Sequence, residues 1–172
     1  FTGTTTYTYK FRFVIDKSAP SYTLKAGTSS ASSGSYVNQQ ITYSVTDYRT
    51  WAIYYKKPGY SSYNTSYNDS YLVAATEANN GWWYFYAEDY YYNTNSVVSL
   101  YLDTVAPKGT VKSGSTTIPN GGYVNGAFSY SATDTGGLSI MQYKTPNSSS
   151  WVTYTVGTNV TGDYGWYFFR AI

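Results

Sequence analysis

The sequence predicts an all-β protein made of two tandem β-sandwich repeats, and three observations carry this prediction. Residues 34–47 (GSYVNQQITYSVTD) return as residues 121–134 (GGYVNGAFSYSATD), 87 positions later and without a gap. Apolar and polar residues alternate through the repeated stretch, which is typical of a strand with one buried face. Aromatic residues make up 21% of the chain and charged residues only 12%, a composition that favours strands over helices.

The repeat sets the expected domain organisation. Between residues 16–47 and residues 103–134, 14 of 32 positions are identical. A chain of 172 residues has room for two units of this period, and each unit is long enough to close a modest core. We therefore expect a first repeat over residues 16–102 and a second repeat over residues 103–172.

Each repeat begins with the same short junction, in which an Asp is followed four residues later by a Pro. Asp16 and Pro20 define the first junction, and Asp103 and Pro107 define the second. Proline fixes its own φ and biases the preceding residue toward extended geometry. Both junctions are therefore predicted to be short and stiff.

A second repeated stretch, GWWYFYAED at residues 81–89 and GWYFFRAI at residues 165–172, predicts a strand with two unlike faces. Arg170 is the residue least suited to burial, so its face is assigned to the outside. Side chains alternate along a strand, so aromatic residues share this outer face in both copies. They are Trp82, Tyr84, Tyr86, Trp166 and Phe168. The alternate positions, from Trp83 to Ala87, are expected to point inward.

Residues 1–15 contain a strong strand pattern, in which aromatic residues alternate with Thr, Lys and Arg. At the same offset this segment matches the end of the first repeat, so we expect it to be the last strand of a preceding repeat. The second repeat stops at Ile172 and is expected to lack its last strand, which would match residues 91–102. About seven short strands per repeat, Gly and Pro at the turns, and no helical periodicity predict that each repeat is a β-sandwich.

The same motifs occur in the same order in both repeats: Asp-x-x-Ala-Pro, Gly-x-Tyr-Val-Asn, Tyr-Ser-x-Thr-Asp, Tyr-Lys-x-Pro and Gly-Trp-Tyr/Trp-x-Phe-x-Ala. Over nearly the whole chain this order resembles the bacterial immunoglobulin-like (Ig-like) tandem repeats of Gram-positive cell-surface proteins and adhesins. The resemblance implies an extracellular stalk or adhesion module without enzymatic activity, with neighbouring repeats of the same protein as its partners. The chain departs from the family after Asp89, where Tyr90, Tyr91 and Tyr92 replace small residues.

Side-chain chemistry gives little support to catalysis, nucleic-acid binding or membrane insertion. The chain has no His and no Cys, and its two adjacent acidic residues, Glu88 and Asp89, point to opposite faces of a predicted strand. The 11 basic residues are scattered and the net charge is +2, without the basic patch that nucleic acids require. No apolar run reaches the roughly 18 residues of a membrane-spanning helix.

Calcium is the one cofactor that the acidic residues suggest. Asp16 and Asp103 lie at the junctions, and Asp89 ends a predicted strand. Asp47 and Asp134 also end strands, so some of these carboxylates could converge and supply part of the roughly six to eight oxygens that Ca²⁺ takes. The alternative is that each Asp caps a turn by accepting hydrogen bonds from nearby backbone N–H groups.

The five outward aromatic residues suggest a role in glycan binding. Together they could form a flat platform that stacks on sugar rings, which would make the chain a carbohydrate-binding module. The alternative is that long loops or a neighbouring repeat cover these rings, since large exposed apolar patches are uncommon without a use.

The pattern at the two ends of the sequence suggests a fibre. Residues 1–15 of one copy could fill the gap in the second repeat of another copy by strand addition. The alternative is that the sequence is a window cut from a long array of such repeats. The function we expect is therefore a non-catalytic extracellular structural or adhesive module of a cell-surface stalk or filament. A carbohydrate-binding module and a strand-exchanged fibre subunit are the alternatives.

Overall fold

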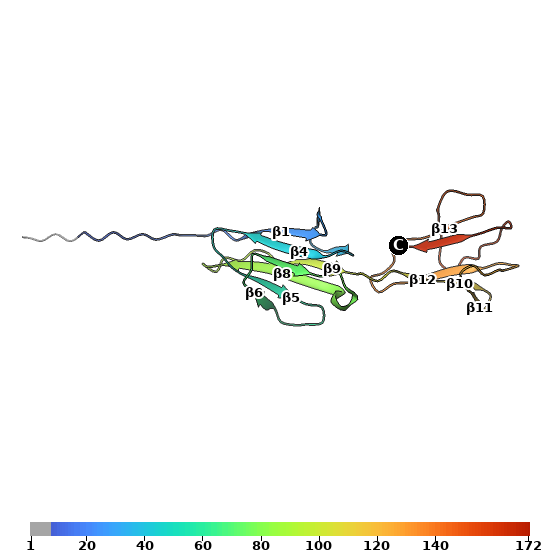
Figure 1. Ribbon diagram of the computed structural model, residues 1–172, viewed down its shortest axis with the longest axis horizontal. Coiled ribbons are helices and arrows are strands. Elements are labelled where there is room, and N and C mark those ends of the chain that lie inside the picture. The colour runs from blue at the N-terminus through green and yellow to red at the C-terminus, as the bar shows by residue number, and fades with distance from the viewer. Residues whose placement is uncertain (1–7) are drawn as a thin grey trace, which may run out of the picture. The chain divides into compact units, whose positions relative to one another are not determined.

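The structure is a computed structural model that describes residues 8–172, and its regular elements in that range are almost all strands (Figure 1). The exception is a single turn of 3₁₀-helix, η1 (Glu77–Asn79), and none of the described residues belongs to a helix long and apolar enough to cross a membrane. The all-β class expected from the alternation and the aromatic content is thereby confirmed.

The chain folds as two compact units. The first takes in the described residues up to Ser35, together with Gln40–Val73 and Trp82–Leu100. The second takes in Tyr36–Gln39, Ala74–Gly81 and Tyr101–Ile172. Three short pieces that the repeat assigns to residues 16–102 are thus grouped with the second unit.

One layer of the first unit is a four-stranded sheet in the order β2-β1-β4-β7. Its strands are β1 (Ser21–Ala26), β2 (Ser29–Ser30), β4 (Ile41–Thr46) and β7 (Ser70–Val73). The central strand β4 pairs antiparallel with β1 on one side and with β7 on the other. Strand β4 lies within the repeated stretch of residues 34–47, where the alternation predicts a strand.

The other layer is a five-stranded sheet in the order β3-β9-β8-β5-β6 (Figure 1). Its strands are β3 (Ser35–Val37), β5 (Thr50–Lys56), β6 (Asn64–Ser66), β8 (Gly81–Asp89) and β9 (Val98–Leu102). In the antiparallel pair of β5 and β8, Tyr54 lies opposite Tyr86 and Lys56 lies opposite Tyr84. A bulge between Thr50 and Ala52 shifts the register near the end of β8.

The inner faces of these two sheets form the core that the alternation predicts. The buried side chains on β4 are Ile41, Tyr43 and Val45, and those on β8 are Trp83, Phe85 and Ala87. The Tyr43 ring of one sheet stacks on the Phe85 ring of the other, with centroids 5.3 Å apart and an interplanar angle of 11°. Since β4 and β8 belong to different sheets, this stack joins the two layers of the first unit.

The second unit contains two three-stranded sheets, in the orders β11-β10-β12 and β14-β13-β15. The first consists of β10 (Lys108–Ser113), β11 (Thr116–Ile118) and β12 (Ser129–Thr133). The second consists of β13 (Met141–Lys144), β14 (Val152–Thr153) and β15 (Phe168–Ala171). Strand β15 pairs antiparallel with β13 on one side only, so it is an edge strand of its sheet.

A smaller aromatic core fills the second unit. Its buried members are Phe128, Tyr130, Met141, Tyr154 and Val160. The Tyr154 hydroxyl accepts a hydrogen bond from the Tyr130 N–H at 3.0 Å and donates one to the Thr158 carbonyl. The buried phenol therefore has both partners that a hydroxyl inside a protein requires.

The N-terminal strand pattern does not form a strand within the part of the chain that is described. Residues 8–15 belong to no sheet, and the side chains of Phe11 and Phe13 are 85% and 81% exposed. Residues 1–7 of the same predicted strand lie outside the described residues. An alternating segment needs a partner strand for its backbone groups, and no strand of the described chain pairs with residues 8–15.

The last strand of the first repeat is shorter than the sequence suggests. Residues 91–102 read as one strand, but β9 contains only Val98–Leu102. The preceding residues form a turn, because the Asp89 carboxylate accepts the backbone N–H of Tyr91 and of Asn93, both at 2.8 Å. The Tyr-rich departure from the family pattern is thus built around a buried carboxylate.

The two junctions form the same local turn. Asp16 Oδ1 accepts the Ser18 N–H at 2.9 Å, and Asp103 Oδ1 accepts the Val105 N–H at 3.1 Å. Further along the first junction, the Asn95 side-chain amide donates to the carbonyl of Pro20 at 3.2 Å. Each junction therefore contains the same local hydrogen bond from its Asp, and the first is also held by Asn95.

Tyr43→Phe tests how the core depends on an un-ionised phenol. Burial raises the pKa of Tyr43 to about 12; the hydrogen bond from Asn95 opposes this rise, and the nearby Tyr22 adds to it. The ordinary value is about 10, so the folded state favours the neutral form, and this stabilisation is complete below pH 10 and lost as the pH rises through 12. Between pH 9 and pH 12, wild type should lose about 2 kcal/mol more unfolding free energy than Tyr43→Phe.

Urea unfolding at each pH, followed by tryptophan fluorescence, measures this difference. Tyr164→Phe, which removes the same hydroxyl from a fully exposed ring, is the control and should follow wild type. If Tyr43→Phe also follows wild type, the phenol is not held neutral by the core.

Candidate functional site

Three carboxylates meet at one end of the first unit. Asp16 precedes β1, Asp47 follows β4, and Asp89 is the last residue of β8. One oxygen from each lies within 4.8 Å of the others. We call Asp16, Asp47 and Asp89 the acidic cluster. It is the one group of three or more potential metal-ligating residues found among residues 8–172.

Asp89 is the buried member of the acidic cluster, with 1% of its surface exposed. Its Oδ1 accepts the N–H groups of Tyr91 and Asn93, and its Oδ2 accepts the Asn93 side-chain amide at 2.7 Å. Burial alone would raise the pKa of Asp89, but the hydrogen bonds from Asn93 and Tyr91 outweigh it and lower the pKa below its usual range. Asp89 is therefore an ionised carboxylate inside the protein at neutral pH.

Asp47 brings an oxygen without a partner to the acidic cluster. Its Oδ1 accepts the Tyr48 N–H at 2.7 Å, which accounts for the turn after β4. Its Oδ2 exposes less than 1 Å² and has no hydrogen-bond partner. The guanidinium of neighbouring Arg49 lies over the rings of Tyr48 and Tyr90 instead, 5.9 and 5.8 Å from their centroids.

The calcium hypothesis named Asp16, Asp103 and Asp89, and the structure brings two of these together. Asp103 belongs to the second unit. There the Asp103 carboxylate packs against Gly136 so closely that a Cβ on this glycine would lie 2.0 Å from Asp103 Oδ2. The third member of the cluster is Asp47, which the sequence marks as a strand end matched by Asp134 at the repeat offset. In the sequence, this match is the signal that could identify Asp47 as a candidate ligand. Only the fold shows which strand ends lie close together.

The outward residues of β8 form an aromatic face on the first unit. Its members, which we call the first aromatic face, are Tyr54, Lys56, Tyr63, Trp82, Tyr84 and Tyr86. All are half-buried. Tyr54 stacks on Tyr86 with centroids 4.7 Å apart, and the Lys56 ammonium lies 4.3 Å from the Tyr84 centroid and 5.3 Å from that of Tyr63. The assignment of this face to the outside of the sheet agrees with the structure.

A related arrangement occurs on the second unit, where the second aromatic face is Gln142, Lys144, Trp151, Trp166, Phe168 and Arg170. The Lys144 ammonium lies 5.0 Å from the Phe168 centroid and 5.4 Å from that of Trp151. The Arg170 guanidinium lies 4.3 Å from the Trp151 centroid. Trp166 and Phe168 are 57% and 51% exposed, so this face is more open than the first.

The chemistry of the two faces is stacking and cation–π attraction. In the first face, Tyr54 and Tyr86 turn their ring faces toward each other, so part of the aromatic surface is used inside the protein. In the second face, the rings of Trp166 and Phe168 are more than half exposed, although Tyr123 lies beside Trp166 and Lys144 lies over Phe168. A lysine lies over the aromatic residue opposite it in both faces, which is a contact that exposed sites favour by about 0.5–1 kcal/mol.

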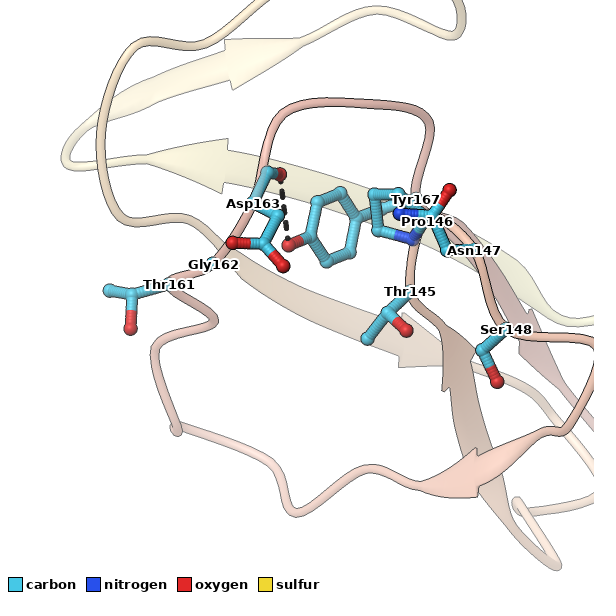
Figure 2. A pocket seen from close by; sticks show the side chains of 8 residues that line it. All are labelled: Thr145, Pro146, Asn147, Ser148, Thr161, Gly162, Asp163 and Tyr167. Carbon is cyan, nitrogen blue, oxygen red and sulfur yellow. Dashed lines mark hydrogen bonds between the residues drawn. The ribbon is translucent and has the colours of Figure 1, made fainter.

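A small cavity of about 250 Å³ lies among loops of the second unit (Figure 2). It is lined by Thr145, Pro146, Asn147, Ser148, Thr161, Gly162, Asp163 and Tyr167. The Tyr167 hydroxyl donates to the Asp163 backbone carbonyl at 3.3 Å, and Asp163 supplies the one carboxylate of the lining. A single carboxylate cannot provide the acid and base pair that glycoside hydrolysis uses.

Comparison of the chain with protein-family models, with curated proteins and with solved structures finds no match. A function proposed for this protein therefore rests on its own residues and contacts. The features that bear on it are the acidic cluster, the two aromatic faces and the repetition of local contacts in both units.

Asp89→Ala tests whether the turn after β8 depends on the buried carboxylate. The substitution leaves two backbone N–H groups and the Asn93 amide without their charged acceptor, and should lower the free energy of unfolding by about 3 kcal/mol. Urea unfolding in EDTA measures the effect without any contribution from bound metal. Asp69→Ala removes an exposed carboxylate and should cost less than about 0.5 kcal/mol. Equal effects of the two substitutions would contradict the role assigned to Asp89.

Proposed function

We propose that this chain is a pair of tandem Ig-like repeats from a bacterial cell-surface protein, acting as a non-catalytic extracellular structural or adhesive module of a stalk or filament. The observation that carries the proposal is that the two repeats share individual contacts as well as sequence motifs. Such repetition is the signature of serial modules that hold parts of a protein apart.

Two sets of contacts support the proposal. At the junctions, Asp16 and Asp103 each accept the N–H two residues ahead. At the ends of β4 and β12, Asp47 and Asp134 each accept the N–H of the next residue, at 2.7 and 2.8 Å. The turn chemistry is therefore the same at these two pairs of matched positions.

The chemistry of the side chains fits a module without catalysis. The chain has no His and no Cys, so a hydrolase would have to use carboxylates or a Ser–Lys pair. All three carboxylates that converge already accept hydrogen bonds from backbone N–H groups nearby in the chain. Burial and backbone hydrogen bonds also fix Asp89 as a structural acceptor.

The second candidate function is a carbohydrate-binding module. The observation that favours it is the exposure of Trp166 and Phe168 beside Lys144 and Arg170 on the second aromatic face. Flat rings next to cationic donors can stack on a pyranose and donate hydrogen bonds to its hydroxyls. On the first aromatic face, Trp82 occupies the position that matches Trp166.

A glycan array separates these two functions. A stalk module should bind no glycan, and Trp82→Ala and Trp166→Ala should leave this result unchanged. A carbohydrate-binding module should bind a defined set of glycans and lose at least about tenfold in affinity when either Trp is removed, since stacking on a ring contributes about 1–3 kcal/mol. Trp51→Ala, which removes an exposed Trp outside both faces, is the matched control and should retain binding.

The third candidate is a fibre subunit built by strand exchange. At the repeat offset of 87, Phe11, Phe13 and Ile15 match the following residues of β9: Val98, Leu100 and Leu102. The β9 residues are 3%, 0% and 0% exposed, whereas the three N-terminal residues are exposed by 72% or more. In the second unit, β15 pairs with β13 and with no other strand of the described residues, and an edge strand of this kind can pair with an added strand.

Light scattering after size-exclusion chromatography tests strand exchange on the 172-residue chain. Exchange predicts oligomers that grow with protein concentration and are abolished by Phe13→Asp, because a carboxylate cannot enter the core position that matches Leu100. Val14→Asp places the same charge on the opposite face of the segment and should still assemble. A monomer at every concentration, or equal loss of assembly in both variants, would contradict the exchange.

A further inference from the structure

We infer that Asp16, Asp47 and Asp89 bind a calcium ion at the end of the first unit where β4 and β8 end. The inference goes beyond the proposed function and does not depend on it, since a cation at this place would stabilise a stalk, a glycan-binding module or a fibre subunit alike. Three observations support it. Three carboxylates lie close together, a buried oxygen of Asp47 has no hydrogen-bond partner, and hydrogen bonds fix the orientation of the buried Asp89 carboxylate.

The convergence of charge calls for a cation. Three carboxylate oxygens from three separate segments lie within 4.8 Å of one another, and one of the three side chains is fully buried. Like charges at this distance repel, and the repulsion grows as water is removed. Among the described residues no ion pair with a Lys or Arg is found for these carboxylates, and the Arg49 guanidinium lies over the Tyr48 and Tyr90 rings.

The second observation concerns Asp47 and is independent of the first. Its Oδ2 exposes less than 1 Å² and accepts no hydrogen bond. A buried acceptor without a donor is costly, and native proteins leave few of them without a reason. A metal ion satisfies such an oxygen directly, because a carboxylate oxygen is a ligand that Ca²⁺ prefers.

The third observation is that Asp89 is held ready to act as a ligand. Its three hydrogen-bond donors fix the orientation of the carboxylate, and Oδ2 accepts only the Asn93 amide, which leaves a lone pair on that oxygen. The same Asn93 amide donates to the Asp16 carbonyl at 3.2 Å and so ties the first junction to the cluster. Polar groups of this kind, which orient the ligands of a metal, are a regular part of metal sites.

Turn capping alone does not explain the arrangement. Capping accounts for Oδ1 of Asp16, for Oδ1 of Asp47 and for both oxygens of Asp89. It does not account for Oδ2 of Asp47, nor for the meeting of three caps at one point. In the second unit, Asp134 makes the same cap as Asp47, but no group of three carboxylates forms among the described residues of that unit.

The ligand chemistry favours calcium over other cations. A site made of carboxylates, in a chain without His or Cys, suits a hard cation rather than Zn²⁺ or Cu²⁺. The ligands come from three separate segments of the chain, and Ca²⁺ accepts irregular geometry with roughly six to eight oxygens. Mg²⁺ demands a near-ideal octahedron and gives up its water reluctantly, so it should bind more weakly here.

Calcium titration of the EDTA-treated 172-residue chain tests the inference. We expect binding of one Ca²⁺ per chain by calorimetry, and a rise of roughly 5 °C or more in the thermal midpoint of the first unit at millimolar CaCl₂. The same concentration of MgCl₂ should produce a smaller rise.

The variant Asp47→Asn distinguishes ion binding by Asp47 from its hydrogen bond in the turn after β4. The asparagine keeps an oxygen for the Tyr48 N–H but removes the negative charge, so the variant should fold and be at least as stable as wild type in EDTA. It should lose the Ca²⁺ response, whereas Asp134→Asn, the matched change in the second repeat, should keep it.

Three results would overturn the inference. The first is the absence of any Ca²⁺ heat or thermal shift in wild type at millimolar concentration. The second is an Asp47→Asn variant that responds to Ca²⁺ as wild type does. The third is an Asp47→Asn variant that is destabilised equally with and without Ca²⁺, because this is the behaviour of a turn cap. None of these results bears on glycan binding or strand exchange, so the inference and the proposed function fail separately.

Discussion

The stack of Tyr43 on Phe85 is the contact on which the rest of the first unit depends. It joins the central strand of one sheet to the central strand of the other, and Tyr22 extends it with a ring 5.6 Å from Tyr43. The buried Tyr43 hydroxyl accepts a hydrogen bond from the Asn95 amide at 2.8 Å, and that amide also donates to Pro20. Hydrogen bonds of Asn95 therefore connect the core, the loop after β8 and the first junction. Asp47 follows β4 and Asp89 ends β8, so the position of the acidic cluster depends on how these two strands pack.

Much of this could be predicted from the sequence, because alternation and the internal repeat are local signals. They gave the bounds of β4 and β8 within a residue and separated the inner face of Trp83 from the outer face of Trp82. Turn capping is one of the two roles that the sequence suggests for Asp89, but the sequence does not show that Asn93 supplies two of its three donors or that the carboxylate is buried, because both depend on how the loop folds. For the same reason it marked Asp47 as a strand end without showing which other carboxylates it meets. Convergence depends on how the two sheets pack.

Both units bury tyrosine side chains, but the groups that hydrogen-bond to the buried hydroxyl differ between them. Tyr43 finds its polar partner in Asn95, a residue of the turn that follows β8. In the second unit, the matching Tyr130 packs against Tyr154, whose hydroxyl instead accepts the backbone N–H of Tyr130. A tyrosine can be buried in either unit because each core supplies a partner for one polar atom on an otherwise apolar ring. Tyr43 and Tyr130 thus keep a buried ring at equivalent positions of the repeat, whereas the hydroxyl that hydrogen-bonds in the core is that of Tyr43 in the first unit and that of Tyr154 in the second.

Tyrosine side chains pack on both faces of these sheets. On the outer face, contacts between rings and between rings and lysines stabilise the surface of a chain that has few charged residues. On the inside the ring supplies buried area, and on the outside it packs against its neighbours and receives a lysine, as Tyr63 and Tyr84 receive Lys56. Such contacts use the positive charges of the chain without pairing them with carboxylates. Lys56, Lys57 and Lys144 contact rings in this way. The concentration of negative charge at the end of β4 and β8 is the place where we propose that Ca²⁺ binds.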